Sequence, residues 1–210
     1  MLLDTGFRPS QHGFTFANTW RDMVFGVVKS RGRCGGMVFA SLDHFLAGAV
    51  PPAAADPLAL PAHDSPLARY IWRRQLGSLG VRFGANLWRF ALLTYLPSAG
   101  PQGVAAVTRR ELLPLFDSLR AGRPAPLGMV SAISLRHLVR NHQVLAYAAE
   151  FGEQLVTVRI YDPNHPRRDD IVIEVPLDAH GPVIERVGAR VIRWRGFFVS
   201  HHKPQRVPSV

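Results

Sequence analysis

The sequence is poor in cysteine and has no long apolar run. Cys34 is the one cysteine, so the chain cannot close an internal disulfide or bind zinc through several of its own thiolates. Without a run of about 18 uninterrupted apolar residues, no transmembrane segment is expected. The opening Met-Leu-Leu-Asp lacks the basic and apolar regions of a secretory signal. We therefore expect a cytoplasmic protein, or one exported without a cleavable signal peptide.

Lysine is also scarce, although the net charge is +10, with 25 Lys+Arg against 15 Asp+Glu. Only Lys29 and Lys203 are lysines, so arginine supplies all the other positive charges. This bias, with abundant Ala, Pro and Gly, is typical of a GC-rich genome, and the chain carries no dedicated nucleic-acid motif. The charge still predicts attraction to an acidic protein or an anionic surface at low salt.

The 210 residues are 47% hydrophobic and 19% charged, which excludes a wholly disordered chain. We predict one domain over residues 1–210, in which helices precede strands; this order favours the α+β class with an antiparallel sheet. Residues 1–13 form an irregular lead-in, 30–33 a turn, 50–63 a Pro/Ala-rich loop and 201–210 a polar tail. Expected helices are 34–46, two within 67–96 broken at Gly77, Gly80 and Gly84, and 108–119. Expected strands are 127–133, 143–148, 155–161, 171–175 and 190–199.

Cys34 stands at the predicted start of a helix and is followed by two glycines. The unpaired N–H groups and positive dipole end of a helix stabilise a thiolate there, and can stabilise an oxyanion on a substrate. Gly35 and Gly36 would let a substrate backbone approach closely. A lone cysteine on a core helix is more commonly a buried, inert residue, so this alternative stays open.

His142 and Asp162 are the candidates to act with this thiol. His142 opens a predicted strand, and Asp162 ends the next one, where it could accept the Nδ1–H of His142 and orient the imidazole. Each also has a structural interpretation, since Asp162-Pro163-Asn164 is strong turn chemistry and a histidine before an apolar strand is commonly structural.

Three short stretches taken together resemble a known family. They are Gly-Arg-Cys-Gly-Gly-Met at 32–37, Asn-His-Gln-Val-Leu-Ala-Tyr at 141–147 and Ile-Tyr-Asp-Pro-Asn at 160–164. This order is similar to that of papain-like cysteine peptidases, in the branch of the bacterial double-glycine leader peptidases. The resemblance implies a papain-like fold with Cys34 as nucleophile, His142 as base and Asp162 as the orienting residue. It extends by analogy to bacterial toxins and effectors.

The sequence departs from the family at the oxyanion hole. Papain-like enzymes usually place a Gln a few residues before the nucleophile, and residues 27–33 contain none. Asn18 is the best substitute, with Gln11 a weaker one, and the backbone N–H of Cys34 would be the second donor.

Other polar clusters have simpler interpretations. Asp162, His165, Asp169 and Asp170 form a solvated acidic loop rather than a metal site, so we predict no metal and no cofactor. Arginines lie between residues 69 and 89 and between 186 and 206, where they could bind an anionic surface. We favour ordinary amphipathic elements, with aromatic residues facing the core and arginines facing water.

The sequence thus favours a cysteine peptidase, or a related amide hydrolase or acyltransferase, that acts on a peptide or protein through an acyl-enzyme. Deamidase and transglutaminase-like activities would use the same residues. The alternative is a catalytically inactive papain-like binding module, whose basic surfaces hold an acidic protein, a membrane or a nucleic acid.

Overall fold

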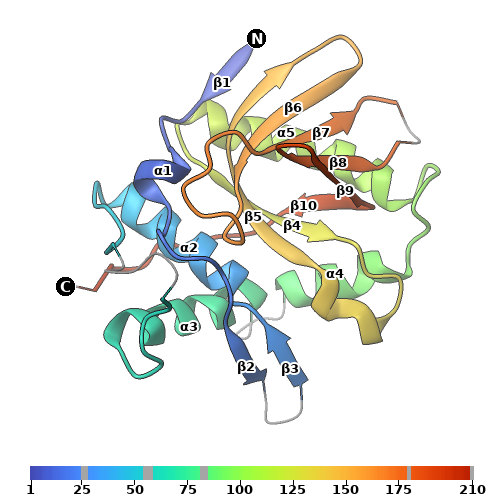
Figure 1. The fold of residues 1–210 in the computed structure, drawn as a ribbon. Coiled ribbons are helices and arrows are strands. Elements are labelled where there is room, and N and C mark those ends of the chain that lie inside the picture. The colour runs from blue at the N-terminus through green and yellow to red at the C-terminus, as the bar shows by residue number, and fades with distance from the viewer. Residues whose placement is uncertain (25–27, 54–58, 81–84, 179–180, 209–210) are drawn as a thin grey trace.

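The computed structural model describes residues 1–24, 28–53, 59–80, 85–178 and 181–208. The chain combines helices with a curled antiparallel sheet, which confirms the predicted α+β class (Figure 1). The helices are α1 Pro9–His12, α2 Cys34–Leu46, α3 Pro66–Leu79, α4 Ala85–Tyr95, α5 Val104–Arg120 and the 3₁₀ helix η1 Leu135–Arg140. The strands are β1 Leu2–Asp4, β2 Arg21–Val24, β3 Val28–Arg31, β4 Ala125–Val130, β5 His142–Phe151, β6 Leu155–Tyr161, β7 Val172–Pro176, β8 Val183–Val187, β9 Arg190–Trp194 and β10 Gly196–Val199.

The large sheet is built around β5. Its strand order is β10-β4-β5-β6-β7-β8-β9, every pair is antiparallel, and β1 adds to β5 beside a shift in the β5–β6 register between Ala146 and Ala148. The first eight residues of β5 are buried, because α2 packs on one face and the main core fills the other. β2 and β3 form a separate hairpin that leads into α2.

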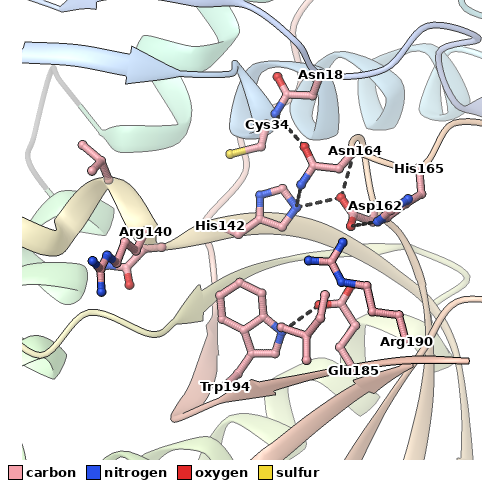
Figure 2. A pocket seen from close by; sticks show the side chains of 13 residues that line it. Asn18, Cys34, Arg140, His142, Asp162, Asn164, His165, Glu185, Arg190 and Trp194 are labelled. Carbon is pink, nitrogen blue, oxygen red and sulfur yellow. Dashed lines mark hydrogen bonds and ion pairs between the residues drawn. The ribbon is translucent and has the colours of Figure 1, made fainter. Parts of the chain in front are cut away.

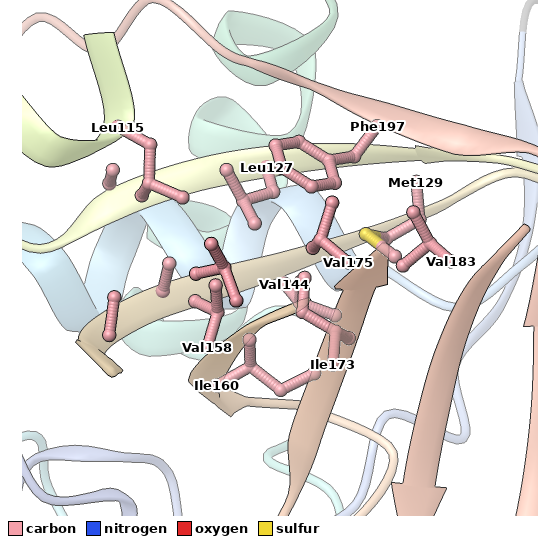
Figure 3. Close-up of a cluster of buried hydrophobic side chains, with 14 of the residues drawn as sticks. Leu115, Leu127, Met129, Val144, Val158, Ile160, Ile173, Val175, Val183 and Phe197 are labelled. Carbon is pink, nitrogen blue, oxygen red and sulfur yellow. The ribbon is translucent and has the colours of Figure 1, made fainter. Parts of the chain in front are cut away.

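The main core lies between the concave face of the sheet and α5 (Figure 3). Leu115 from α5 meets Leu127 of β4 and Phe197 of β10, and Val144 and Ile173 extend the cluster along the sheet. Apolar residues form this core at every second position of the strands and along one face of α5, as expected for a helix packed on a sheet.

Several predicted boundaries are wrong. The helix expected to start at Thr108 begins at Val104, because the Thr108 hydroxyl bonds to Val104 O at 3.0 Å and to Phe197 of β10 instead of capping. The strand expected over 190–199 is two strands, β9 and β10, and β8 was not predicted. The turn expected at 30–33 is the end of β3 followed by Gly32. Gly77 lies inside α3, Gly80 ends that helix with φ +71, and the break expected at Gly84 lies outside the described residues.

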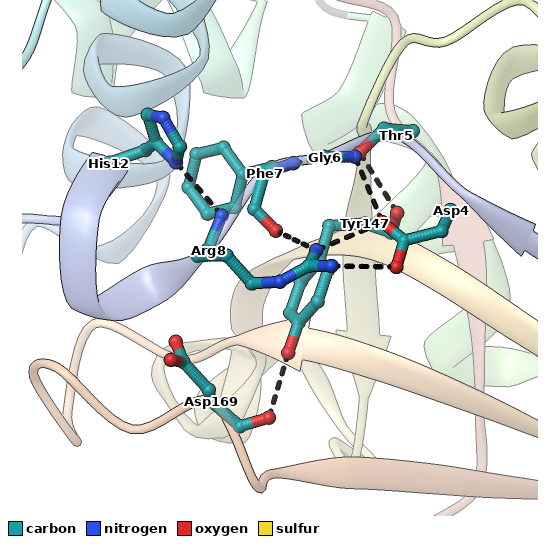
Figure 4. Close-up of polar contacts among 8 residues, drawn as sticks. All are labelled: Asp4, Thr5, Gly6, Phe7, Arg8, His12, Tyr147 and Asp169. Carbon is teal, nitrogen blue, oxygen red and sulfur yellow. Dashed lines mark hydrogen bonds and ion pairs between the residues drawn. The ribbon is translucent and has the colours of Figure 1, made fainter.

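The N-terminal segment is ordered, contrary to the predicted irregular lead-in. Besides containing β1 and α1, it is held by an Arg8–Asp4 pair with contacts of 2.8 and 2.9 Å (Figure 4). The Arg8 backbone N–H donates to His12 Nδ1 at 2.9 Å, and Ser10 binds both carboxylate oxygens of Asp169. Local propensity does not reveal all of this order, because β1 pairs with β5 and Ser10 binds Asp169, both of which are distant in sequence.

The predicted polar tail at 201–210 is anchored to the helices through a few of its residues. Asp43 of α2 is buried, and His202 Nε2 and the backbone N–H of Gln205 lie 2.9 and 3.0 Å from its Oδ1. From α3, Arg74 Nε lies 2.7 Å from Asp43 Oδ2 and the Tyr70 hydroxyl donates at 2.7 Å. Asp43 therefore ties the C-terminal segment and α3 to the helix that begins at Cys34.

Two glycines set the distance between α2 and α3. A Cβ on Gly36 would lie 2.2 Å from the backbone oxygen of Ile71, and one on Gly35 would lie 2.1 Å from Ser78 Oγ. The Gly36 N–H donates to Gln75 Oε1 at 2.8 Å, so the two helices are also linked by a buried hydrogen bond. Only glycine permits so close an approach of the two backbones.

Gly36→Ala is expected to lower the free energy of unfolding by about 1–3 kcal/mol, because the added methyl group meets backbone that cannot rotate away. Urea denaturation measures the loss. Gly77→Ala is the matched control on α3, where the nearest atom is an Arg74 side-chain nitrogen 3.8 Å away. There alanine is expected to stabilise by about 1 kcal/mol through helix propensity. Equal effects of both variants would contradict the packing argument.

Candidate active site

Cys34 begins α2, as the sequence predicted, and the preceding residues fix that helix start. The Asn18 side-chain oxygen accepts the Arg33 N–H at 2.5 Å. Gly32 has φ +92, and a Cβ there would lie 2.3 Å from Asn18 Nδ2, so the Asn18 amide lies close against this glycine. A side chain from 15 residues earlier in the chain thus holds the backbone just before the thiol.

His142 is the first residue of β5 and pairs with Met129 of β4. Its neighbour Asn141 accepts the backbone N–H groups of Ser131 and Ala132 at 2.9 and 3.0 Å, which fixes the passage from η1 into the strand. With 8% of its surface exposed, the His142 ring is held against α2 by the packing of that helix on β5.

Asp162 follows the last residue of β6 and contacts His142, as the sequence predicted. The Asp162 Oδ1 atom lies 2.7 Å from His142 Nε2. The expectation that Asp162 binds Nδ1 is wrong, and Nδ1 is left for the Cys34 side of the ring. Asp162 Oδ1 also accepts the Asn164 N–H at 2.8 Å, so the turn role and the contact with histidine occur in the same residue.

A cavity of 440 Å³ opens onto these three side chains. Figure 2 shows the Cys34 and His142 side chains close together, with Asp162 and Asn164 on the far side of the imidazole. The cavity is lined by Asn18, Cys34, Val139, Arg140, Asn141, His142, Asp162, Asn164, His165, Glu185, Arg190, Ile192 and Trp194. The helix start, the first strand residue and the strand end therefore meet at one accessible place.

The electrostatics of the three groups favour a thiolate and an imidazolium. Burial raises the pKa of the Cys34 thiol, but the charge and hydrogen bond of His142, with the N–H groups of Gln143 and Gly35, bring it below its ordinary value. Burial lowers the pKa of His142, and Asp162 and Cys34 raise it well above its ordinary value. Burial raises the pKa of Asp162, but the larger opposing effect of His142 and the Asn164 N–H leaves this pKa below its ordinary value. Each charge stabilises the other, so both pKa shifts act in the direction of a thiolate–imidazolium pair.

Of the residues predicted to form the oxyanion hole or to bind substrate, Asn18 and Cys34 line the cavity, and Gly35, Gly36 and Gln11 do not. Asn18 lines the cavity, where its Nδ2 donates to Asn164 Oδ1 at 3.2 Å. Within the described ranges, the backbone N–H of Cys34 has no acceptor. Gly35 and Gly36 do not line the cavity, so helix packing rather than substrate approach accounts for both glycines. Gln11 lies in α1 and does not line the cavity either.

The other polar candidates have separate partners. His44 is buried on α2 and its Nδ1 lies 2.8 Å from Ala40 O. Asp169 binds Ser10 and Asp170 pairs with Arg168, so these acids do not converge with Asp162. Among the residues that the structure describes, no group of three or more His, Cys, Asp or Glu could hold a metal ion. The same part of the chain contains no helix long and apolar enough to cross a membrane.

Two predicted basic segments are only partly solvent-facing. Trp194, Phe197 and Phe198 are buried and Arg190 and Arg193 are exposed, as expected for an ordinary strand pair. Arg195 instead binds backbone oxygens at the end of α4 and beyond, including Ala132 O at 2.6 Å. Arg74, with 2% of its surface exposed, is committed to Asp43.

Sequence reasoning missed Glu185 and the role of Trp194. The Trp194 ring stacks on His142, with centroids 6.2 Å apart and planes 17° from parallel, and its Nε1–H donates to Glu185 Oε2 at 2.7 Å. The available signal was the alternation in Val-Ile-Glu-Arg-Val at 183–187, which places Glu185 on the same face as Val183 and Val187.

Comparison with known protein families, curated proteins and solved structures finds no significant match to this chain.

Proposed function

We propose that the protein is a cysteine-dependent hydrolase or acyltransferase of papain-like type, most simply a peptidase. The observation that carries the proposal is the hydrogen bond of 2.7 Å between His142 and Asp162, with the Cys34 thiol on the other side of the same imidazole in an open cavity. A nucleophile, a base and an orienting acid in this relation are the requirements of nucleophilic acyl transfer.

In the proposed reaction, the Cys34 thiolate attacks the carbonyl carbon of an amide or thioester. The His142 imidazolium gives its proton to the leaving nitrogen or sulfur as the tetrahedral intermediate collapses to an acyl-enzyme. Neutral His142 then takes a proton from water, which attacks the thioester and releases the acid. With a primary amide as substrate the product is ammonia, and with an amine in place of water the acyl group is transferred.

The Cys34 backbone N–H is the proposed oxyanion donor, with Asn18 Nδ2 as the second. An Asn amide carries two N–H groups, and Asn164 engages Nδ2 through a contact of 3.2 Å. Asn18 would therefore contribute its other N–H, in the place where a papain-like enzyme usually has Gln.

A catalytically inactive binding module is the second candidate, and the engagement of Asn18 by Arg33 and Asn164 is the observation that favours it. Such a module would bind anionic vesicles or nucleic acid with a steep dependence on salt. It would also leave the thiol with the reactivity of an ordinary cysteine.

The reactivity of Cys34 with iodoacetamide tests the choice. Between about pH 5 and pH 6, the rate for a free cysteine rises about tenfold because its thiolate fraction does. We expect the rate for Cys34 to change less than about threefold and to exceed that of free cysteine about tenfold at pH 5. Mass spectrometry measures the labelling, with Cys34→Ser as the blank. A rate that follows free cysteine would exclude the proposed enzyme.

A further inference from the structure

The floor of the cavity contains an acid that the proposed reaction does not use. Glu185 has 0% of its surface exposed and lies on the inward face of β8 between Val183 and Val187. Figure 2 shows its carboxyl group below the His142–Asp162 pair, beside the Trp194 indole. Burying a carboxyl group here costs free energy unless it is hydrogen-bonded or neutral.

One of the two Glu185 oxygens has a clear partner. Oε2 accepts the Trp194 Nε1–H at 2.7 Å, and the same indole stacks on the His142 ring. Glu185 therefore holds a ring that packs directly against the proposed base. No donor reaches Oε1 in the part of the chain that the structure describes. A carboxyl oxygen in this position can itself be the donor if it carries the proton.

The groups around Glu185 favour that proton. Asp162, which follows β6, lines the same cavity and places a negative charge near Glu185. Burial and Asp162 raise the pKa of Glu185 to about 7, while Trp194 and His142 act to lower it. The other charged groups lining this cavity are Arg140, His165 and Arg190. His165 Nε2 lies 3.8 Å from Asp162 Oδ2, and within the described residues no hydrogen bond from Arg190 reaches Glu185 Oε1.

We propose that Glu185 is a positioning residue for this site. It shares a proton between its Oε1 and the Asp162 carboxylate, and it holds the Trp194 indole against His142. The inference rests on the proposed function. The protonated Glu185 leaves Asp162 as the single carboxylate beside the imidazolium, opposite the Cys34 thiolate. Loss of that proton would remove the donor and place two buried carboxylates side by side, which repel each other.

Infrared difference spectroscopy of the whole protein between pH 5 and pH 9 tests the proton directly. A protonated carboxyl group has a C=O stretch distinct from that of a carboxylate. We expect one such band in the wild-type protein that disappears at about pH 7, and we expect no such band in Glu185→Gln. Glu174→Gln, on the neighbouring strand β7, is the control and should keep the band. A Glu185→Gln spectrum identical to that of the wild type would overturn the inference.

Alkylation of Cys34 by iodoacetamide at pH 5 tests the positioning role. A glutamine can still accept from Trp194 and donate to Asp162, so Glu185→Gln should keep the wild-type rate within about threefold. Glu185→Leu removes both contacts and should lower the rate about tenfold. Equal rates in the Gln and Leu variants would contradict the role. Slow wild-type labelling would instead refute the proposed function, and this inference with it, whereas fast labelling without a titrating band overturns this inference alone.

Discussion

Replacing His142 by alanine is expected to lower kcat/KM at least about a thousandfold on any peptide or amide that the wild-type protein turns over. The variant loses the charge and hydrogen bond that bring the Cys34 pKa below its ordinary value, while the burial that raises this pKa remains. It also loses the acid that protonates the leaving group. Alkylation at pH 5 should slow at least about tenfold, because little thiolate is then present.

His201→Ala is a suitable control for this variant, since His201 is exposed and does not line the cavity. Its alkylation rate and turnover should equal those of the wild type. Circular dichroism would establish that His142→Ala is folded. A folded His142→Ala protein that keeps its alkylation rate within about threefold would show that the imidazole does not activate Cys34.

Replacing Asp43 by alanine is expected to lower the free energy of unfolding by about 3–5 kcal/mol, because it leaves the buried Arg74 without its counter-charge. The Tyr70 hydroxyl, the His202 ring and the Gln205 N–H lose their acceptor as well. Urea denaturation followed by fluorescence measures the loss.

Two further variants distinguish the effect of the unpaired buried charge on stability from the effect of shortening an aspartate side chain. Asp117→Ala removes an acid whose pairing with Arg120 is well exposed, and should cost less than about 1 kcal/mol. Adding Arg74→Met to Asp43→Ala removes the unpaired cation and should recover a large part of the stability. A loss below about 1 kcal/mol for Asp43→Ala alone would contradict the claim that this variant leaves a buried, unpaired Arg74.

The elements that sequence patterns predicted best are those with a strong local signal. β6 has the predicted limits, and α2 begins at Cys34 as predicted, where an apolar helical stripe follows the polar residues 29–33. The order of Cys34, His142 and Asp162 also selected three residues that the fold brings to one cavity. Their chemical roles remain a proposal.

The missed features depend on contacts between distant segments. β1 is a strand because β5 offers it a partner some 145 residues later, as in the pairing of Leu3 with Ala149. Asp43 appears in sequence as one polar residue on a helix, and its partners come from α3 and the C-terminal segment. Which imidazole nitrogen faces Asp162 depends on the side-chain rotamer, which no pattern specifies.

The single cysteine has a consequence for the study of folding. Its proposed activation needs α2, the start of β5, the end of β6 and the β8–β9 hairpin to have met, although these segments span most of the chain. Long-range contacts of this kind form only after large loops have closed. On the proposed function, an unfolded or partly folded chain therefore carries an ordinary thiol, and we expect the native chain alone to react as a thiolate at low pH. A brief alkylation pulse at pH 5 during refolding would thus count native molecules. Because Cys34 is the one cysteine of the sequence, no other thiol would contribute to the count.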